Sequence, residues 1–235
     1  MAFDCENGPV EYLEVMIQGQ RWTLERTAAL EILWEAIGSD GCGPGGFGPD
    51  DFGEDERLPY WAELWPASFV LADWLGRNAA RLDGRLCLDM GCGLGLTALL
   101  ASKHGAHVVG LDYEWPALYF ARRNVFLNEV PSPMWVQMDW RWSGFRQAAF
   151  PFIWGGDIMY EKRFAEPVAR FVEGALAPGG VFWLAEPNRS VYEYFIKQMK
   201  SQGWNCSRID TVATRPPYAA KVTVTVNLWE FTRRA

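Results

Sequence analysis

The chain of 235 residues is long enough for one domain with a full core, and 49% hydrophobic against 22% charged residues is an ordinary globular balance. Its net charge of −7 lacks the basic surplus on which nucleic-acid binding usually depends, so we expect a neutral or cationic partner instead of DNA or RNA. No stretch approaches the roughly 18 uninterrupted apolar residues of a membrane span, and the acidic start does not resemble a signal peptide.

The first part of the chain differs in composition from the rest. Residues 10–17 are predicted to form a strand, and residues 23–37 have apolar positions at helical spacing before Gly38. Residues 38–56 contain seven glycines, two prolines and six acidic residues, which predicts a mobile surface loop. We therefore expect residues 1–57 to be an N-terminal extension and residues 58–235 to be the main domain.

From residue 68 onward, helices and strands are predicted to alternate. The expected helices are 68–78, 97–104, 116–129, 164–176 and 190–202, the last with Ser190 as its N-cap. The expected strands between them are 85–90, 108–112, 134–138, 152–156 and 181–185. Residues 205–214 and 221–231 are two further strands joined by a turn at Pro216-Pro217, with no helix between them. The order predicts an α/β fold with a doubly wound, mostly parallel seven-stranded sheet and an antiparallel C-terminal strand.

A glycine-rich turn follows the first strand of this alternating region. Asp89 is followed by glycines at every second position, Gly91, Gly93 and Gly95, immediately before a helix. Such glycines let the backbone turn sharply and approach a ligand at a helix N-terminus. A dinucleotide site would have G-x-G-x-x-G, but position 96 is leucine, which disfavours a nicotinamide dehydrogenase. The D-x-G-x-G-x-G form resembles motif I of class I methyltransferases, which implies that this turn holds the methionine part of S-adenosylmethionine.

The next two strands also end in groups suited to such a cofactor. Asp112 ends the second strand, where a carboxylate accepts hydrogen bonds from both ribose hydroxyls. Asp139 and Trp140 follow the third strand, where a carboxylate accepts from an adenine amino group and an indole stacks on the ring. We therefore expect Asp112, Asp139 and Trp140 to bind the cofactor.

Two further motifs indicate the acceptor. Asp157-Ile158-Met159-Tyr160 follows the fourth strand, and Leu64-Trp65-Pro66 precedes the core. Together with Met138-Asp139-Trp140, they resemble the seven-β-strand protein lysine methyltransferases, which have W-P, D-W and D-x-x-Y motifs. Residues 59–62 and 186–189 look most similar to the electron-transfer-flavoprotein β-subunit branch, and the resemblance covers about residues 58–232.

The resemblance implies a Rossmann-like class I fold and transfer of a methyl group from S-adenosylmethionine to a lysine of a protein substrate. It also implies that Trp65 helps to bind cofactor and that Asp157 and Tyr160 shape the lysine channel. Glu186 stands where the family pattern has aspartate. Two alternatives stay open: a small-molecule N-methyltransferase acting on an amine or heterocyclic nitrogen, and a non-catalytic cofactor-binding or scaffold protein.

Cysteine and histidine usage bears on compartment and metal binding. The five cysteines are an odd, scattered set without a C-x-x-C pair, which predicts free thiols in the cytoplasm. His104 and His107 have no cysteine or carboxylate at ligand spacing, so no metal site is expected.

Overall fold

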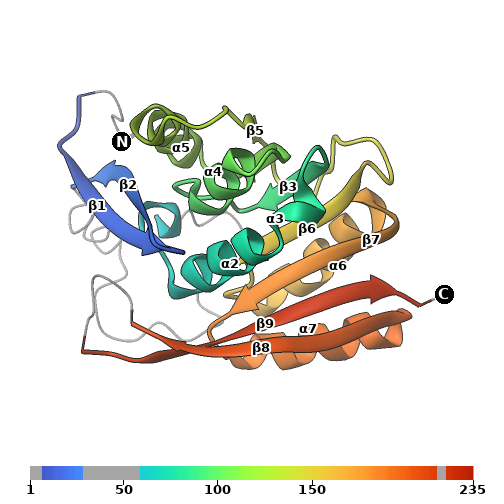
Figure 1. The fold of residues 1–235 in the computed structure, drawn as a ribbon. Coiled ribbons are helices and arrows are strands. Elements are labelled where there is room, and N and C mark those ends of the chain that lie inside the picture. The colour runs from blue at the N-terminus through green and yellow to red at the C-terminus, as the bar shows by residue number, and fades with distance from the viewer. Residues whose placement is uncertain (1–6, 29–58, 216–220, 235) are drawn as a thin grey trace, which may run out of the picture.

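The computed structural model describes residues 7–28, 59–215 and 221–234, which form an α/β structure around one large sheet (Figure 1). The predicted loop 38–56 and the turn at Pro216-Pro217 lie outside these residues. None of the described helices is long and apolar enough to cross a membrane.

The seven strands of the sheet have the order β5-β4-β3-β6-β7-β9-β8. They are β3 (Leu86–Met90), β4 (His107–Asp112), β5 (Met134–Gln137), β6 (Phe150–Gly156), β7 (Leu176–Glu186), β8 (Trp204–Thr214) and β9 (Val224–Arg233). Strands β3 to β7 are parallel, whereas β9 is antiparallel to both of its neighbours, β7 and β8. This topology confirms the predicted Rossmann-like, mostly parallel seven-stranded fold.

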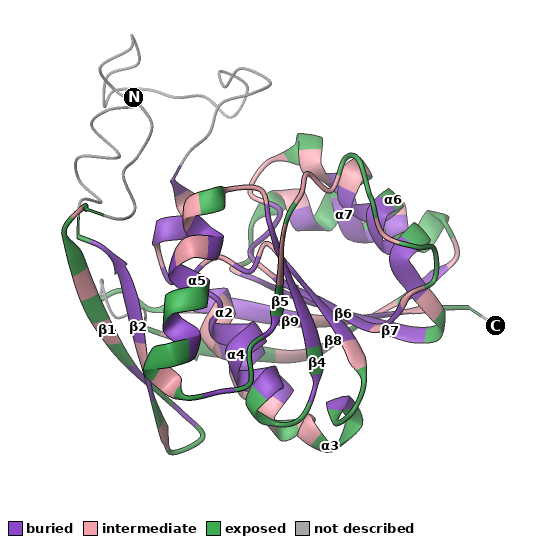
Figure 2. Cartoon of the chain, turned by 90° about the horizontal axis from the view of Figure 1, so that it is seen from above, coloured by how far each residue is buried: buried purple, intermediate pink, exposed green. Residues whose placement is uncertain are grey.

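Helices cover both faces of the sheet (Figure 1). They are α2 (Pro66–Arg77), α3 (Ala79–Leu82), α4 (Leu96–Lys103), α5 (Trp115–Asn128), α6 (Ala165–Ala175) and α7 (Ser190–Ser201). Because side chains alternate along a strand, Trp183 and Ala185 of β7 pack in one apolar cluster with α2, α4 and α5. Phe182 and Leu184 face the other way and pack with α6 and α7. Figure 2 shows the strands between these layers as mainly buried.

The N-terminal part contains a hairpin, so the helix predicted for residues 23–37 is wrong over its first turn. Strands β1 (Val10–Ile17) and β2 (Gln20–Thr27) pair in antiparallel fashion through Gln18 and Gly19, both with positive φ. Two successive positive φ values make the tight turn that suits a two-residue hairpin. Trp22 and Leu24 are buried at alternate positions of β2. This period of two is typical of a strand and was overlooked in the prediction of a helix. The rest of the predicted helix, from residue 29, lies outside the described residues.

The N-cap prediction at the start of α7 is wrong by one residue. Arg189, with extended backbone dihedrals, is the N-cap, and Ser190 is the first helical residue. No side chain caps this helix end. The Arg189 side chain instead reaches Asp157, at the end of β6.

Candidate functional site

The loops after the parallel strands converge at the carboxyl end of the sheet, where β3 and β6 are neighbours although they are far apart in sequence. Chain connections run outward in opposite directions from this point, which is where open α/β sheets bind ligands. A pocket of about 360 Å³ lies there. Its lining includes eight of the residues predicted from sequence: Trp65, Gly91, Gly93, Asp112, Asp139, Trp140, Asp157 and Tyr160.

Asp112 and the glycine turn form one end of this pocket. The Asp112 carboxylate accepts hydrogen bonds from the backbone N–H groups of Gly93 at 2.8 Å and Glu114 at 3.0 Å. Burial raises the pKa of Asp112, and these two backbone hydrogen bonds oppose the rise. At Gly91, φ is +64° and a Cβ atom would lie 2.9 Å from Ile158, so a side chain does not fit. The turn and the carboxylate therefore fix one another at the tip of β3 and β4.

Asp89 and Gly95, also predicted to bind cofactor, lie behind the turn and are not among the residues that line the pocket. Asp89 is fully buried and accepts a 2.5 Å hydrogen bond from the Thr97 hydroxyl. Gly95 is the N-cap of α4, and a Cβ atom there would lie 3.0 Å from Ala121 and 3.2 Å from Trp135. Both residues shape the turn from the side opposite the pocket.

Asp139 and Trp140 form the wall that follows β5. The Asp139 carboxylate accepts hydrogen bonds from the backbone N–H of Arg141 at 2.8 Å and from its Nε at 2.7 Å. The Trp140 indole meets the Phe164 ring edge-on, with centroids 5.8 Å apart. Phe164 thus supports the indole, and it carried no signal in the sequence beyond its place after the D-x-x-Y motif.

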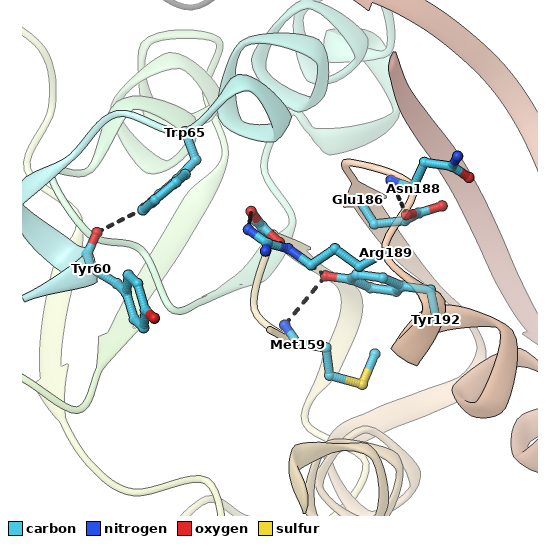
Figure 3. A network of polar contacts seen from close by, with 8 residues as sticks. Tyr60, Trp65, Met159, Glu186, Asn188, Arg189 and Tyr192 are labelled. Atoms are coloured by element: carbon cyan, nitrogen blue, oxygen red, sulfur yellow. Dashed lines mark hydrogen bonds and ion pairs between the residues drawn. The ribbon is translucent and has the colours of Figure 1, made fainter. Parts of the chain in front are cut away.

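Asp157 also lines the pocket, and its charge is compensated. The Arg189 guanidinium binds both carboxylate oxygens, with Nε 3.1 Å from Oδ1 and Nη2 2.9 Å from Oδ2. The Tyr192 hydroxyl lies 3.5 Å from Oδ1 and accepts a hydrogen bond from the Met159 N–H at 3.3 Å. Figure 3 shows Arg189 and Tyr192 converging beside Met159, opposite Tyr60 and Trp65. Arg189 belongs to the segment 186–189 that carried the family resemblance, whereas Tyr192 had no signal in the sequence.

Aromatic side chains surround the place where Asp157 meets the pocket. The Tyr60 ring lies 4.5 Å from the Tyr160 ring and 5.8 Å from the Trp65 ring, between centroids. Tyr160 in turn contacts Phe164 edge-on at 5.0 Å. Burial raises the pKa of Tyr160 well above its ordinary value, with Glu161 adding to the rise, so its phenol is neutral at physiological pH.

A second pocket, of about 520 Å³, adjoins the first. The two share Tyr60, Trp65, Asp157 and Tyr160 in their walls. The remaining lining residues of the second pocket come from the segment after Tyr160 and the start of α7: Glu161, Lys162, Arg189, Ser190, Val191 and Tyr194. Two compartments therefore meet at one aromatic and acidic junction. Within the described residues there is no cluster of three His, Cys, Asp or Glu side chains that could hold a metal ion.

The family model described as a methyltransferase domain matches residues 87–180. Residues 87–180 thus resemble a methyltransferase domain. The match begins in β3 and ends in β7, so it contains the glycine turn and the ends of β4, β5 and β6. Trp65 lies before this methyltransferase domain, and Arg189 and Tyr192 lie after it, although all three contribute to the site.

Known proteins resemble the chain well beyond the methyltransferase domain. It is 30% identical to the electron transfer flavoprotein beta subunit lysine methyltransferase of Danio rerio over 137 residues, covering 57% of this chain and 52% of that protein. It is 27% identical to the histone-arginine methyltransferase METTL23 of Mus musculus over 153 residues, covering 63% and 57%. The chain thus spans little more than half the length of these relatives.

The solved structures agree on the fold. The T. thermophilus 16S rRNA N2 G1207 methyltransferase RsmC, solved with AdoMet and guanosine, superposes with a TM-score of 0.60 at 18% identity. The superposition covers 97% of this chain and 51% of that one. The chain therefore has the fold of class I methyltransferases.

Proposed function

We propose that the protein transfers a methyl group from S-adenosylmethionine to a lysine side chain of a protein substrate. The observation that carries the proposal is the meeting of the two pockets at Tyr60, Trp65, Asp157 and Tyr160. A transferase needs one compartment for the donor, another for the acceptor, and a junction where they react. The first pocket is then the donor site and the second the acceptor site.

The proposed donor site assigns one part of the cofactor to each strand end. The backbone of Gly91 and Gly93 faces the methionine part, and Asp112 accepts from the ribose hydroxyls. Asp139 and Trp140 hold the adenine by a hydrogen bond and a flat ring face, and Trp65 closes the opposite side. This order brings the sulfonium methyl to the junction between the pockets.

The proposed chemistry at the junction is an in-line displacement in which the amine nitrogen attacks the methyl carbon and the C–S bond breaks. Alignment of the two groups lowers the barrier most, because no covalent intermediate with the enzyme is needed. A lysine amine, with an ordinary pKa of about 10.4, must first lose a proton to water. The Tyr160 hydroxyl then orients the neutral amine by a hydrogen bond, and the Tyr60 and Tyr160 rings face the cation that forms.

The similar proteins differ in the residue type that their names give as the methyl acceptor. One relative is named for a lysine and the other for a histone arginine. The junction favours lysine, since it is bounded by the closely packed rings of Tyr60 and Tyr160, which suit a slender amine better than a broad planar guanidinium. A protein substrate is supported by the second pocket, which runs to Tyr194 on the surface of α7.

We also propose a reducing compartment, the cytoplasm. Cys87, Cys92 and Cys206 are free thiols, and Cys87 and Cys92 are buried. Burial raises the pKa of Cys87 to about 12, which makes this thiol unreactive. Structural thiols of this kind persist where disulfides do not form.

Calorimetry tests the donor half of the proposal. The chain is expected to bind S-adenosylmethionine and S-adenosylhomocysteine but not NAD. Asp112→Ala should weaken binding by roughly 1.5–3 kcal/mol, the usual cost of losing hydrogen bonds to a charged acceptor. Asp210→Asn, on the edge strand β8 and outside both pockets, is the control and should bind as the wild type does. Tight binding of NAD without binding of the sulfonium cofactor would contradict the assignment.

Methyl labelling tests the acceptor half. The enzyme and tritiated S-adenosylmethionine are added to cell lysate, and macromolecules are separated from small metabolites. We expect label in a discrete protein, and hydrolysis followed by amino-acid analysis should find it in methyllysine. Label in methylarginine would replace lysine as the acceptor, and label confined to small molecules would establish the small-molecule alternative. Cofactor binding without any methyl transfer would favour the non-catalytic alternative.

A further inference from the structure

Two adjacent residues of the N-terminal hairpin reach two separate walls of the donor pocket. Glu25 and Arg26 stand side by side on β2, about sixty residues before the matched methyltransferase domain. None of residues 10–27 lines the pocket. Any effect of the hairpin on the cofactor is therefore indirect, and the polar contacts of these two residues lead to residues that line the pocket.

The first connection runs from Glu25 through Asn124 to the glycine turn. The Asn124 side chain is completely buried on α5 and accepts a 2.7 Å hydrogen bond from the Glu25 backbone N–H. Its amide donates to the Glu25 carbonyl at 3.2 Å and to the Leu94 carbonyl at 3.0 Å. Leu94 lies between Gly93 and Gly95 and lines the pocket. One buried amide thus joins the β2 backbone to the backbone of the glycine turn.

Arg123 strengthens this connection from the same helix. Its guanidinium forms a bidentate pair with the Glu25 carboxylate, which is almost fully buried. The side chain and the backbone of Glu25 are therefore both held on α5. A strand end with three such contacts is fixed relative to the turn that the helix supports.

The second connection runs from Arg26 to Glu63. The Arg26 guanidinium lies 2.5 Å from a Glu63 carboxylate oxygen and 2.7 Å from Glu11 of β1, and its side chain is only 8% exposed. The same Glu63 oxygen accepts a 3.0 Å hydrogen bond from the Leu64 N–H. Glu63 and Leu64 line the pocket and lead directly to Trp65. Arg26 thus holds the segment that contributes Glu63, Leu64 and Trp65 to the pocket lining.

We infer that Arg26 and Asn124 are positioning residues for the cofactor, and that the β1–β2 hairpin completes the donor site without touching the ligand. The inference rests on the proposed function, since it assigns the first pocket to S-adenosylmethionine. Loss of either connection frees one wall of the pocket in the unbound protein. Binding must then order that wall again, which lowers affinity without removing any contact to the cofactor.

The test measures S-adenosylhomocysteine affinity by calorimetry in Arg26→Met and Asn124→Ala, at a temperature where urea titration shows each variant to be folded. We expect the dissociation constant to rise at least tenfold in each. Arg26→Lys retains the charge but loses the guanidinium group that binds Glu63 and Glu11 together, so its dissociation constant should lie between those of the wild type and Arg26→Met. If Arg26→Met does not fold, the dissociation constant of Arg26→Lys tests the role of Arg26.

Two controls separate positioning from general stability. Glu11→Ala removes the Arg26 contact within the hairpin but keeps the one to Glu63, so its affinity should stay within twofold of the wild type. Val15→Ala destabilises the buried face of the hairpin and leaves both polar connections in place, and it should also bind normally. Normal affinity in Arg26→Met and Asn124→Ala, or equal weakening in Val15→Ala, would overturn the inference. A wild-type protein that binds no S-adenosylhomocysteine would refute the proposed function instead.

Discussion

The surroundings of Asp157 determine what its carboxylate can do. Its side chain is 3% exposed, both oxygens are bound by Arg189, and its φ of +52° is tolerated by aspartate better than by most residues. A backbone hydrogen bond from its N–H to the Ala185 carbonyl, at 2.9 Å, holds the same turn. The carboxylate is therefore a fixed part of the junction, and an incoming ammonium group meets an ion pair instead of a free anion.

Asp157→Asn and Tyr160→Phe are expected to lower turnover on the order of 10²-fold or more, because the first weakens the ion pair with Arg189 that fixes the junction and the second removes the hydroxyl that orients the acceptor. Both variants should still bind S-adenosylhomocysteine like the wild type, since neither group lies at the adenosine end. The measurement pairs single-turnover methyl transfer to the labelled protein substrate with calorimetry. Glu166→Gln, on the exposed face of α6, is the control. Unchanged turnover in both site variants would remove them from the reacting site.

Asp89 makes stability depend on pH. Burial, reinforced by the charge of Asp112, raises its pKa from 3.8 to about 7, although the Thr97 hydroxyl opposes the rise. The folded state thus holds the proton more tightly than the unfolded state. Consequently the contribution of Asp89 to the free energy of unfolding is greatest below about pH 4 and falls as pH rises to 7, by at most about 4 kcal/mol.

We therefore expect Asp89→Asn to be more stable than the wild type at pH 8, with the difference shrinking at pH 5. Urea unfolding at the two pH values measures it. In the variant, the free energy of unfolding should change less steeply with pH but should still depend on pH, because burial also raises the pKa of Asp112 and Glu186. Asp210→Asn should leave the slope as it is. An equal slope in Asp89→Asn and the wild type would contradict the role assigned to this carboxyl.

At the scale of elements, the junction of the glycine turn with α4 leaves little room for a side chain. Gly95 has φ +88° and faces Ala121 and Trp135 at 3.0–3.2 Å from where a Cβ atom would lie. An L-residue in the left-handed region costs roughly 1–2 kcal/mol before any contact is counted. The close approach of α4 and α5 depends on this position having no side chain.

Gly95→Ala is expected to lower the free energy of unfolding by about 2 kcal/mol or more and to weaken cofactor binding as well. Gly174, in α6, has nothing within 4 Å of its Cβ position and does not have a positive φ. Gly174→Ala should therefore stabilise the protein by about 0.5–1 kcal/mol. Urea unfolding should show a lower free energy of unfolding in Gly95→Ala and a higher one in Gly174→Ala, each relative to the wild type. Changes of the same sign would contradict the conformational difference between the two glycines.

The elements from residue 68 onward were predictable because the spacing of their apolar residues agrees with the positions of the glycines and prolines that bound them. Glycines follow the first alternating strand, and Pro116 stands in the first turn of α5. The second strand of the hairpin was missed because the apolar residues in and after it also fit a helical spacing. Of the site, the strand-end residues were predictable because parallel strands end at one edge. The contacts of Arg189 and Tyr192 with Asp157 were not predictable, since only the folded chain brings α7 beside the end of β6.

At the scale of the whole molecule, the hairpin and the sheet share one core. Val15, Ile17, Trp22 and Leu24 belong to the apolar cluster that contains α2, α4, α5 and one face of the sheet. Figure 2 shows the hairpin alongside α5. Unfolding of the hairpin would expose the buried side of that helix, so we expect one cooperative transition.

Leu24→Ala, at a site with 0% exposure, should lower the free energy of unfolding of the whole described fold by about 2–5 kcal/mol. Circular dichroism in urea and hydrogen exchange of the β6 amides should report the same decrease. Leu127→Ala, 41% exposed on α5, should change stability by less than about 0.5 kcal/mol. A hairpin that unfolds by itself, with β6 protection unchanged, would contradict a shared core.

The tryptophans are distributed in a way that affects how the protein can be observed. Trp61, Trp65 and Trp140 line the donor pocket, whereas Trp154, Trp183 and Trp204 are fully buried away from solvent. The buried indoles therefore give a constant emission background, and the three in the pocket respond to what lies against them. If the first pocket binds S-adenosylmethionine as proposed, we expect its purine ring to stack on Trp140 and to quench the emission of that indole. The unlabelled protein thus contains its own optical reporter of occupancy, which allows ligand exchange to be followed on the millisecond scale in a stopped-flow fluorimeter.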